Sequence, residues 1–465
     1  MGVPPICRYI LPHFFVFINC PDKGRLPESL PDFHKSAWLP ERALLQAVAT
    51  QETPEVCAHP QELRSAQCPC YNLPMRICYT LTSYPPAIGG AQAHFHALAR
   101  ALSPAHEVQV VAQWRDNRTD WLLGTTLLAP WNPRPYAVDG VSVAPLRLSL
   151  SDRLMLAPLA AAYYPLKDAA LPGISRILER RLAEICLAPE VIHNGRIGRE
   201  GISYASRDLA RRLDVPFVFT PFHHPRWVGW FYRAYIRLYQ EADAVIALTQ
   251  AERETLAALG VAEERIHVTG MGAILAQRHD AAGFRTRYGI DGPMILFVGQ
   301  KYPYKNYEAV LAAAPLVWER WPDARFVFIG PRTSHSQRVF AVQPDPRIVE
   351  LGIVGLEEKT SALAACDVFC MPSSQESFGG VFVEAWLMGK PVIGGDIPAV
   401  REVISDGVDG FLVSADPAQI ADRINALLGE AGLAARMGEA GHSKALANYT
   451  WDKLAAKTLA VYEGL

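Results

Sequence analysis

The sequence predicts an α/β fold in which two Rossmann-like domains face each other across a cleft. The first observation behind this prediction is an alternation that begins at Met75, where short apolar runs are separated by amphipathic segments of helical period. Such alternation is typical of parallel sheets covered by helices on both faces. The second observation is that the alternation occurs as two series, joined around residues 275–292. A length of 465 residues also favours two or three domains.

The predicted elements follow in order along each series. The first series opens with the strand, turn and helix of "MRICYTLTSYPPAIGGAQAHFHALARAL", and its later strands are "HEVQVVAQW", "EVIHNG", "VPFVFTPF" and "ADAVIALT". The strands of the second series are "PMILFVGQK", "ARFVFIG", "RIVELGIV", "CDVFCMPS", "KPVIGG" and "GFLV". We expect a first domain over residues 75–280, a second over 281–445, and a last amphipathic helix within 446–465 that returns to the first domain.

Residues 1–74 differ from the rest of the chain. They are rich in Pro and Cys and show no sustained period of a strand or a helix. The apolar run from Tyr9 to Cys20 is interrupted by Pro12 and His13 and is too short to span a membrane. We therefore expect either a poorly ordered extension or a natural start at Met75.

Composition limits the compartment and the partners. The formal net charge of -2 gives no general attraction to nucleic acid, and we expect none as a partner. Nine scattered cysteines, an odd number, favour a reducing compartment, so a cytoplasmic protein is predicted. The stretch Arg226–Tyr239 interleaves aromatic residues with arginines. A helix packed within the first domain is the favoured interpretation, and contact with the inner membrane surface or a lipid-linked acceptor is the alternative.

Two loops that follow strands carry candidate ligand-binding residues. In "SYPPAIGGAQ", Gly89 and Gly90 stand between a strand and its helix, where backbone can approach an anion. The loop lacks the G-x-G-x-x-G pattern of dinucleotide-binding proteins. In "VGQKYPYKN", Lys301 and Lys305 follow the first strand of the second series and can neutralise a diphosphate. An ordinary tight turn and a solvated loop are the alternatives.

The most specific stretch is "SSQESFGGVFVEAWLMGKPVIGG", residues 373–395. Its pattern predicts a loop after a buried strand, followed by a helix that begins near Gly380. The first turn of that helix offers free N–H groups to a phosphate. Glu376 in the loop and Glu384 in the helix are suited to accept hydrogen bonds from the hydroxyls of a sugar and a ribose.

This stretch resembles the signature of family four retaining glycosyltransferases, the glycosyl transferases of group 1, in which seven residues separate two glutamates. The resemblance runs from Met75 to the end of the chain and includes "IHVTGMG" and "EVISDGVDGFLV". It implies the GT-B fold, with the active site between two Rossmann-like domains. It also implies a donor site, in which Glu376 lies near the sugar hydroxyls and Glu384 binds the ribose. The remaining implied donor-binding residues are Gly89, Gly90, Lys305, Phe378, Gly379, Gly380 and Val381.

Two positions leave questions open. The family usually has Arg directly after the glycine of "VGQK", whereas this chain has Gln300 followed by Lys301. The family also carries a histidine after a late strand of the first domain, and "FTPFHHPRW" offers both His223 and His224 there. We favour His223 as the catalytic partner of Glu376. Asn194 and Arg196 in "HNGRIGRE" are weaker candidates for the acceptor side, with a structural turn as the alternative.

The predicted function is transfer of a sugar from a nucleotide-diphosphate donor to an acceptor hydroxyl, with retention of the anomeric configuration. The acceptor could be a glycan, a lipid-linked molecule or a small molecule. No cofactor is predicted, and no metal, because no acidic D-x-D pair stands at the site. The alternatives are a non-catalytic nucleotide-sugar binder or scaffold of the same fold, encouraged by Gln300, and a nucleotide-sugar epimerase.

Overall fold

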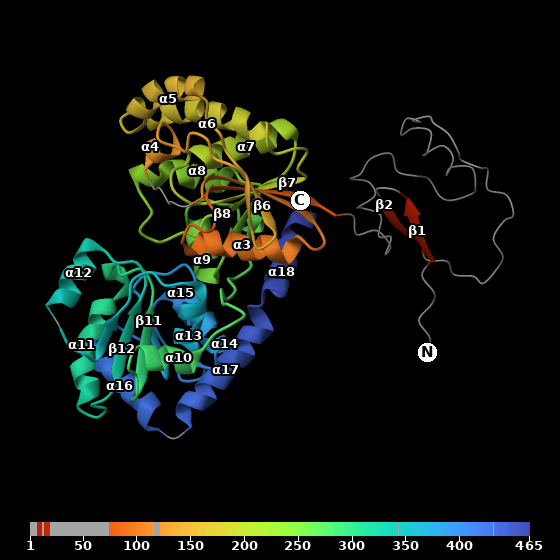
Figure 1. Cartoon of the computed structure of the whole chain (residues 1–465). Helices are drawn as coiled ribbons and strands as arrows, with labels where there is room; N and C mark the ends of the chain where they lie inside the picture. Colours follow the sequence, from red (N-terminus) through yellow and green to blue (C-terminus); the bar gives the residue numbers. More distant parts are fainter. Residues whose placement is uncertain (1–6, 12–13, 19–73, 116–120, 343, 431) are drawn as a thin grey trace. The chain divides into compact units, whose positions relative to one another are not determined.

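The computed structural model describes residues 7–11, 14–18, 74–115, 121–342, 344–430 and 432–465 (Figure 1). The chain divides into two compact units, Met1–Asn72 and Leu73–Leu465. In the first unit, β1 (Cys7–Leu11) pairs antiparallel with β2 (Phe14–Ile18). The rest of residues 1–73 lies outside the described residues, so the expected extension over residues 1–74 stays a prediction.

The second unit begins with an eight-stranded sheet in the order β10-β9-β8-β7-β3-β4-β6-β5. All neighbouring strands are parallel except β5, which pairs antiparallel with β6. The strands are β3 (Arg76–Ser83), β4 (Glu107–Trp114), β5 (Tyr136–Val138), β6 (Val141–Pro145), β7 (Val191–Gly195), β8 (Phe217–Thr220), β9 (Ala244–Ala247) and β10 (Ile266–Val268). The helices are α3 (Gly90–Leu102), α4 (Leu122–Thr125), α5 (Leu150–Tyr163), α6 (Lys167–Ala183), α7 (Gly201–Leu213), η1 (Trp230–Tyr232), α8 (Arg233–Glu241), α9 (Gln250–Ala258) and η2 (Glu263–Arg265).

A second, fully parallel sheet of six strands follows in the order β13-β12-β11-β14-β15-β16. Its strands are β11 (Met294–Val298), β12 (Arg325–Ile329), β13 (Ile348–Glu350), β14 (Val368–Met371), β15 (Val392–Gly395) and β16 (Gly410–Val413). Its helices are α10 (Ala281–Arg287), η3 (Pro303–Lys305), α11 (Tyr307–Trp318), α12 (Ser334–Ala341), α13 (Leu356–Ala365), α14 (Gly380–Leu387), α15 (Pro398–Val403), α16 (Pro417–Gly429) and α17 (Leu433–Asn448). The predicted fold class is confirmed.

Both sheets are covered on their two faces, and their strand sequences show why. Every residue of β11, "MILFV", is buried, as is every residue of β8 and β14. Continuous apolar runs of this kind suit parallel strands, because neither face of the sheet meets water. Of the described helices, none is both long enough and apolar enough to cross a membrane.

The last helix, α18 (Trp451–Glu463), packs beside α3 of the first domain (Figure 1). The Tyr462 hydroxyl lies 2.6 Å from Nδ1 of His193 on β7 and 3.3 Å from the Tyr79 hydroxyl on β3. At the other end, the Trp451 indole N–H donates to the Ala273 carbonyl over 2.7 Å. The chain therefore passes between the domains twice, once after β10 and once before α18.

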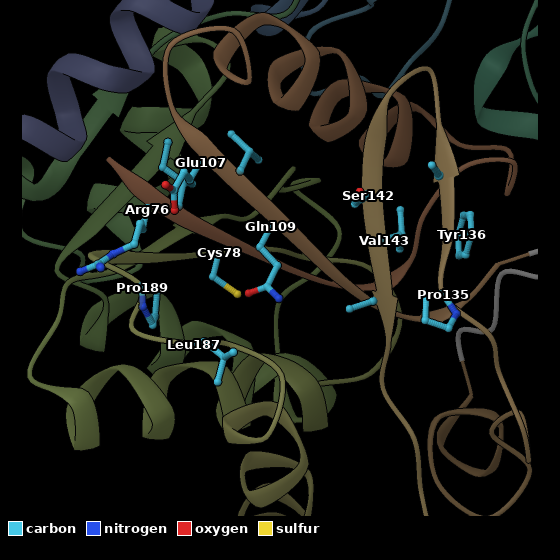
Figure 2. A pocket seen from close by; sticks show the side chains of 14 residues that line it. Arg76, Cys78, Glu107, Gln109, Pro135, Tyr136, Ser142, Val143, Leu187 and Pro189 are labelled. Carbon is cyan, nitrogen blue, oxygen red and sulfur yellow. The ribbon is translucent and has the colours of Figure 1, made fainter. Parts of the chain in front are cut away.

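A hollow of about 640 Å³ lies at the amino ends of β3 and β4 (Figure 2). Arg76 and Glu107, the first residues of these strands, stand at its edge, and Cys78 and Gln109 line it. Ligands of parallel α/β sheets bind outside the carboxyl ends of the strands. This hollow is at the opposite edge, so it is not the candidate active site.

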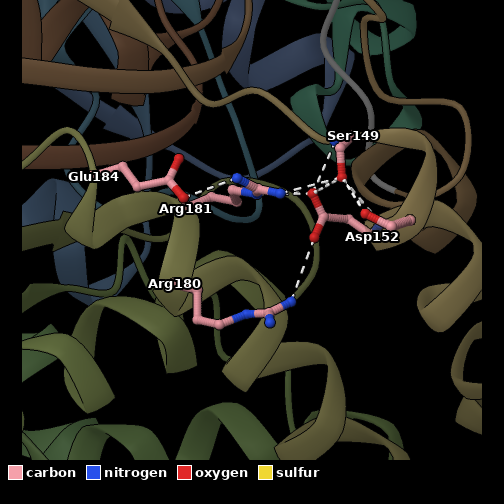
Figure 3. Close-up of polar contacts among 6 residues, drawn as sticks. Ser149, Asp152, Arg180, Arg181 and Glu184 are labelled. Atoms are coloured by element: carbon pink, nitrogen blue, oxygen red, sulfur yellow. Dashed lines mark hydrogen bonds and ion pairs between the residues drawn. The ribbon is translucent and has the colours of Figure 1, made fainter.

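Helices α5 and α6 are joined by a buried carboxylate (Figure 3). Asp152 is the third residue of α5, and it forms a capping box with Ser149, whose backbone N–H donates to it over 2.8 Å. Arg181 of α6 donates from Nε to the same carboxylate over 2.8 Å. Burial acts to raise the pKa of Asp152, but the hydrogen bonds from Arg181 and Ser149 bring it below its ordinary value. The Asp152 contacts fix the outer helix pair of the first domain.

Candidate active site

A cavity of about 1150 Å³ lies between the two sheets and is lined from both domains. Its walls are loops that follow strands β3, β7 and β8 in the first domain and β11 and β14 in the second. These are carboxyl ends of parallel strands, the edge at which such folds bind ligands. Most of the residues proposed from the sequence line it, namely Gly89, Gly90, Lys305, Glu376, Phe378, Gly379, Gly380, Val381 and Glu384.

The turn before α14 brings backbone N–H groups to this cavity. Gly379 has φ +87°, a left-handed conformation that side chains rarely adopt, and α14 starts at the next residue. A Cβ at position 379 would lie 2.6 Å from the Phe382 ring, so both backbone and space require glycine here. The first N–H groups of a helix lack partners within the helix and attract anions. The wall at Gly379–Val381 can therefore receive a phosphate.

Glu376 and Lys305 form an ion pair on this wall. Lys305 ends η3, and Glu376 lies in the loop after β14, so two neighbouring strand ends supply the pair. Both side chains are largely buried but line the cavity. A carboxylate beside an ammonium group offers acceptors for sugar hydroxyls and a donor for a phosphate oxygen.

Glu384 is held from two sides. Its Oε2 lies 2.8 Å from Nζ of Lys359, and its Oε1 accepts from the Ile274 backbone N–H over 3.2 Å. Lys359 also donates to the Ile274 carbonyl over 2.8 Å and lines the cavity. The sequence reasoning missed Lys359, which lies on α13, 25 residues from its partner. In the sequence, the only sign that Lys359 belongs to the site was its place on the helix directly preceding β14.

Lys301 does not reach the cavity, contrary to the expectation that it would bind the donor. Its side chain is fully buried, and Nζ donates to the carbonyls of Gly330 and Leu351, each over 2.7 Å. Nζ also lies 2.6 Å from the Glu350 carboxylate. Lys301 thus ties the ends of β11, β12 and β13 together, while Gln300 lines the cavity in its place.

The cavity is lined by His224, whereas His223, which the sequence led us to favour, is not among its lining residues. His223 is 2% exposed; its backbone N–H donates to Glu252, and its ring packs against Tyr239. His224 stacks edge-on against Trp227, and its Nδ1 has no hydrogen-bond partner among the residues that the structure describes. Burial, reinforced by the positive charges of Lys305, Arg226 and Arg196, lowers the pKa of His224 to about 3. His224 is therefore a neutral hydrogen-bonding group near pH 7.

The first-domain wall also carries arginines; Arg196 was considered from the sequence as an acceptor-side residue, and Arg226 as the start of the aromatic and basic stretch. Arg196 lines the cavity, whereas its neighbour Asn194 is fully buried and donates to the Thr80 carbonyl over 2.6 Å. Asn194 is therefore structural. Arg199 and Arg226 line the cavity as well.

Two Rossmann-like domains around a cleft, with a glycine turn and two glutamates on one wall, define the class of two-domain glycosyltransferases with the GT-B fold. The family comparison agrees. Residues 292–430 match the model of the glycosyl transferases group 1, and residues 89–272 match the glycosyl transferase 4-like domain. The chain belongs to the group 1 glycosyltransferases, and the resemblance stated from the sequence is confirmed.

Individual relatives cover parts of the chain. Phosphatidyl-myo-inositol mannosyltransferase of Mycobacterium tuberculosis is 35% identical over 183 residues, 38% of this chain and 48% of the relative. D-inositol 3-phosphate glycosyltransferase of Xylanimonas cellulosilytica is 33% identical over 240 residues, 48% of this chain and 57% of the relative. The matches thus span about half the length of these relatives. The crystal structure of Anabaena HepE in complex with UDP and glucose has a TM-score of 0.64 at 18% identity, covering 84% of this chain and 100% of that one.

Proposed function

We propose that this protein is a retaining glycosyltransferase that moves a sugar from a nucleoside diphosphate to an acceptor hydroxyl. The observation that carries the proposal is the grouping of Glu376, Glu384 and the Gly379 turn on one wall of the cleft. In the reaction, the bond between the anomeric carbon and the β-phosphate oxygen breaks. The acceptor oxygen bonds to that carbon on the same face, and its proton passes to the leaving phosphate.

The second domain, residues 281–445, is proposed to bind the donor. The N-terminus of α14 and Lys305 would stabilise the negative charge that develops on the leaving diphosphate. Glu384, fixed by Lys359 and by the Ile274 N–H, would accept from the ribose hydroxyls. Glu376 would accept from hydroxyls of the transferred sugar. No metal is assigned a role, and this remains a prediction.

The first domain, residues 75–280, is proposed to bind the acceptor and to cover the sugar. His224 is neutral at physiological pH, so it can accept or donate a hydrogen bond at the sugar without adding charge. The Gly89–Gly90 loop faces the same cavity. Enclosure between the domains keeps out water, which would otherwise hydrolyse the donor.

The relatives suggest which substrates to test first. Two of them act, by their names, on inositol-containing phosphate compounds, and the structural neighbour was solved with UDP. The loop before α8, which ends in η1, exposes Val228, Trp230 and Phe231, each about half accessible to solvent. Aromatic and aliphatic side chains of this kind can insert at the surface of a bilayer. We propose a cytoplasmic protein that reaches a membrane-borne acceptor at the inner surface with this loop.

The test is incubation of the full chain with UDP-, GDP- and ADP-sugars, with binding followed by thermal shift and turnover by release of nucleoside diphosphate. We expect one nucleotide series to raise the melting temperature, because a ligand of the folded state stabilises it by mass action. Glu384→Gln should weaken that shift, and the matched surface variant Glu439→Gln should preserve it. Binding without turnover across a broad acceptor panel would favour the scaffold alternative, and no binding of any donor would refute the proposal.

A further inference from the structure

The two walls of the cavity differ in charge. On the second-domain wall, the charged residues are two lysines and two glutamates, and they are paired as Lys305 with Glu376 and Lys359 with Glu384. That wall is electrically balanced. The first-domain wall carries three arginines, Arg196, Arg199 and Arg226, and one glutamate, Glu200.

Glu200 compensates the three arginines only in part, because it is paired with Lys167 as well as acting electrostatically on Arg199. Its Oε1 lies 3.0 Å from Nζ of Lys167, and both side chains are 1% exposed. The hydroxyl of Tyr163 donates to its other oxygen. Lys167 is itself outside the cavity lining. Among the described residues, none of the three arginines forms an ion pair with a carboxylate, although Glu200 and Glu252 lie near enough to act electrostatically on Arg199 and Arg196.

Arg196 and Arg226 are positioned by aromatic rings, with no ion pair to a carboxylate among the described residues. The Arg196 guanidinium is 3.9 Å from the centre of the Trp227 ring and 4.2 Å from that of Tyr235, and it donates to the Tyr239 hydroxyl. Arg226 stacks 4.4 Å from the centre of the Tyr304 ring, which belongs to the opposite wall. Stacking fixes the plane of a guanidinium while its N–H groups remain available in the ring plane.

Arg199 adds a buried donor to this set. Its Nε is inaccessible to solvent and has no hydrogen-bond partner within the described part of the chain. A buried donor without a partner costs free energy unless a ligand or water satisfies it. The arrangement is thus a preorganised set of donors and positive charges on one wall of a cleft.

We propose that Arg196, Arg199 and Arg226 form a phosphate-binding subsite for the acceptor, so that the acceptor is a phosphorylated hydroxyl compound. Three positive charges fit a phosphate, which carries close to two negative charges near pH 7, better than a carboxylate, which carries one. The aromatic side chains of Trp227 and Tyr235 add apolar surface beside the subsite.

The donor diphosphate is the other phosphate that could occupy these arginines. It has a separate place in the proposed function, at Lys305 and the start of α14 on the second-domain wall. Assigning this subsite to the acceptor rests on the proposed function. Its affinity for phosphate does not depend on that function. The experiment must separate these two sources.

The test uses the full chain saturated with whichever of UDP, GDP or ADP binds, titrated with glycerol 1-phosphate at constant ionic strength. Glycerol serves as the uncharged match, and binding is followed by calorimetry. The main variant is Arg226→Gln, because Arg226 is exposed and its replacement leaves the core intact. Arg233→Gln is the matched control, since Arg233 pairs with Asp168 and lies outside the cavity lining.

We expect the chain to bind glycerol 1-phosphate but not glycerol. Arg226→Gln should weaken this binding about tenfold, the usual effect of losing one charged hydrogen bond. Arg233→Gln should leave it unchanged, and the affinity for the nucleoside diphosphate should stay the same in both variants. Arg196→Gln should reproduce the loss if it folds.

Two results would overturn the proposal. One is an equal loss of nucleoside diphosphate and glycerol 1-phosphate binding in Arg226→Gln, which would assign the arginines to the donor. The other is absence of glycerol 1-phosphate binding in the unsubstituted chain. If no nucleoside diphosphate binds, the same titration is made on the free chain. Arg226-dependent binding there would support the subsite and remove only the donor assignment.

Discussion

Replacing Lys359 by Met tests how the cavity wall holds Glu384. The change keeps an unbranched apolar side chain, one atom shorter, and removes the ammonium group. It deletes two contacts of 2.8 Å, one to the Glu384 carboxylate and one to the Ile274 carbonyl. The Glu384 side chain, only 6% exposed, then retains the Ile274 N–H as its one hydrogen-bond donor among the described residues. A nearly buried charge is left without its countercharge.

The expected cost follows from this burial. Breaking a buried ion pair by removing one partner costs about 3–5 kcal/mol. The Lys359 side chain is 18% exposed, so water screens part of the interaction, and we expect a loss of about 2–3 kcal/mol in the free energy of unfolding. Glu384→Gln should cost less, about 1 kcal/mol, because the amide oxygen can still accept from Ile274 and Lys359 can turn towards water.

The assay is urea unfolding of both single variants and of the double variant, followed by circular dichroism. The double variant should be more stable than the sum of the single losses predicts, with a coupling of about 1–2 kcal/mol. Titration with nucleoside diphosphates would show whether either change also lowers affinity. The reasoning is refuted if Lys359→Met costs no more than Glu384→Gln, or if the coupling is zero.

Three further predictions concern other parts of the molecule. Glu376→Gln should lower the turnover of a bound donor by about 10²–10³-fold, since the amide cannot accept from sugar hydroxyls as a carboxylate does; steady-state kinetics measures this. Burial raises the pKa of Glu252 to about 7 despite backbone N–H donors. The folded state therefore keeps a proton that the unfolded chain releases near pH 4.5, so stability should fall as the pH rises from about 4.5 to 7; unfolding of Glu252→Gln should lack this slope. Gly441→Ala would place a Cβ 2.0 Å from the Trp386 ring and should cost about 1–3 kcal/mol, measured in urea.

Each of these has an outcome that contradicts it. Normal turnover by Glu376→Gln would remove that carboxylate from the site. If Glu252→Gln and the unsubstituted chain had the same dependence of stability on pH, the Glu252 carboxyl group would not titrate between about pH 4.5 and 7. Unchanged stability of Gly441→Ala would mean that Trp386 has room to move. Glu439→Gln, an exposed substitution on α17, is a suitable control for all three.

The sequence predicted the features that depend on a single strand and its following helix. The glycine turn and the pair Glu376 and Glu384 are local to β14 and α14, so their spacing was enough to place both carboxylates at one strand end. The alternation of apolar runs likewise predicted both sheets. The order of strands within the sheets depends on contacts between distant segments. A local sequence pattern therefore cannot predict it.

Side-chain direction explains where the structure differs from these expectations. Lys301 and Lys305 look equivalent in "GQKYPYKN", but the chain turns after β11, and Lys301 points into the space among three strand ends. His223 and His224 are neighbours at the end of β8, and a one-residue step decides which of them faces the cavity. Lys359 was missed because its partner lies on another helix, and only folding brings the two together.

The contacts of Tyr462 mean that the first domain is not one continuous stretch of chain. Its core includes a helix from the far end of the sequence, and His193 would lose its closest hydrogen-bond partner, at 2.6 Å, without that helix. A hybrid that joins this first domain to the donor domain of a relative must therefore keep α18 from this protein, with a junction on each side of the exchanged segment. Shuffling at a single junction would combine a sheet and a helix that never evolved together.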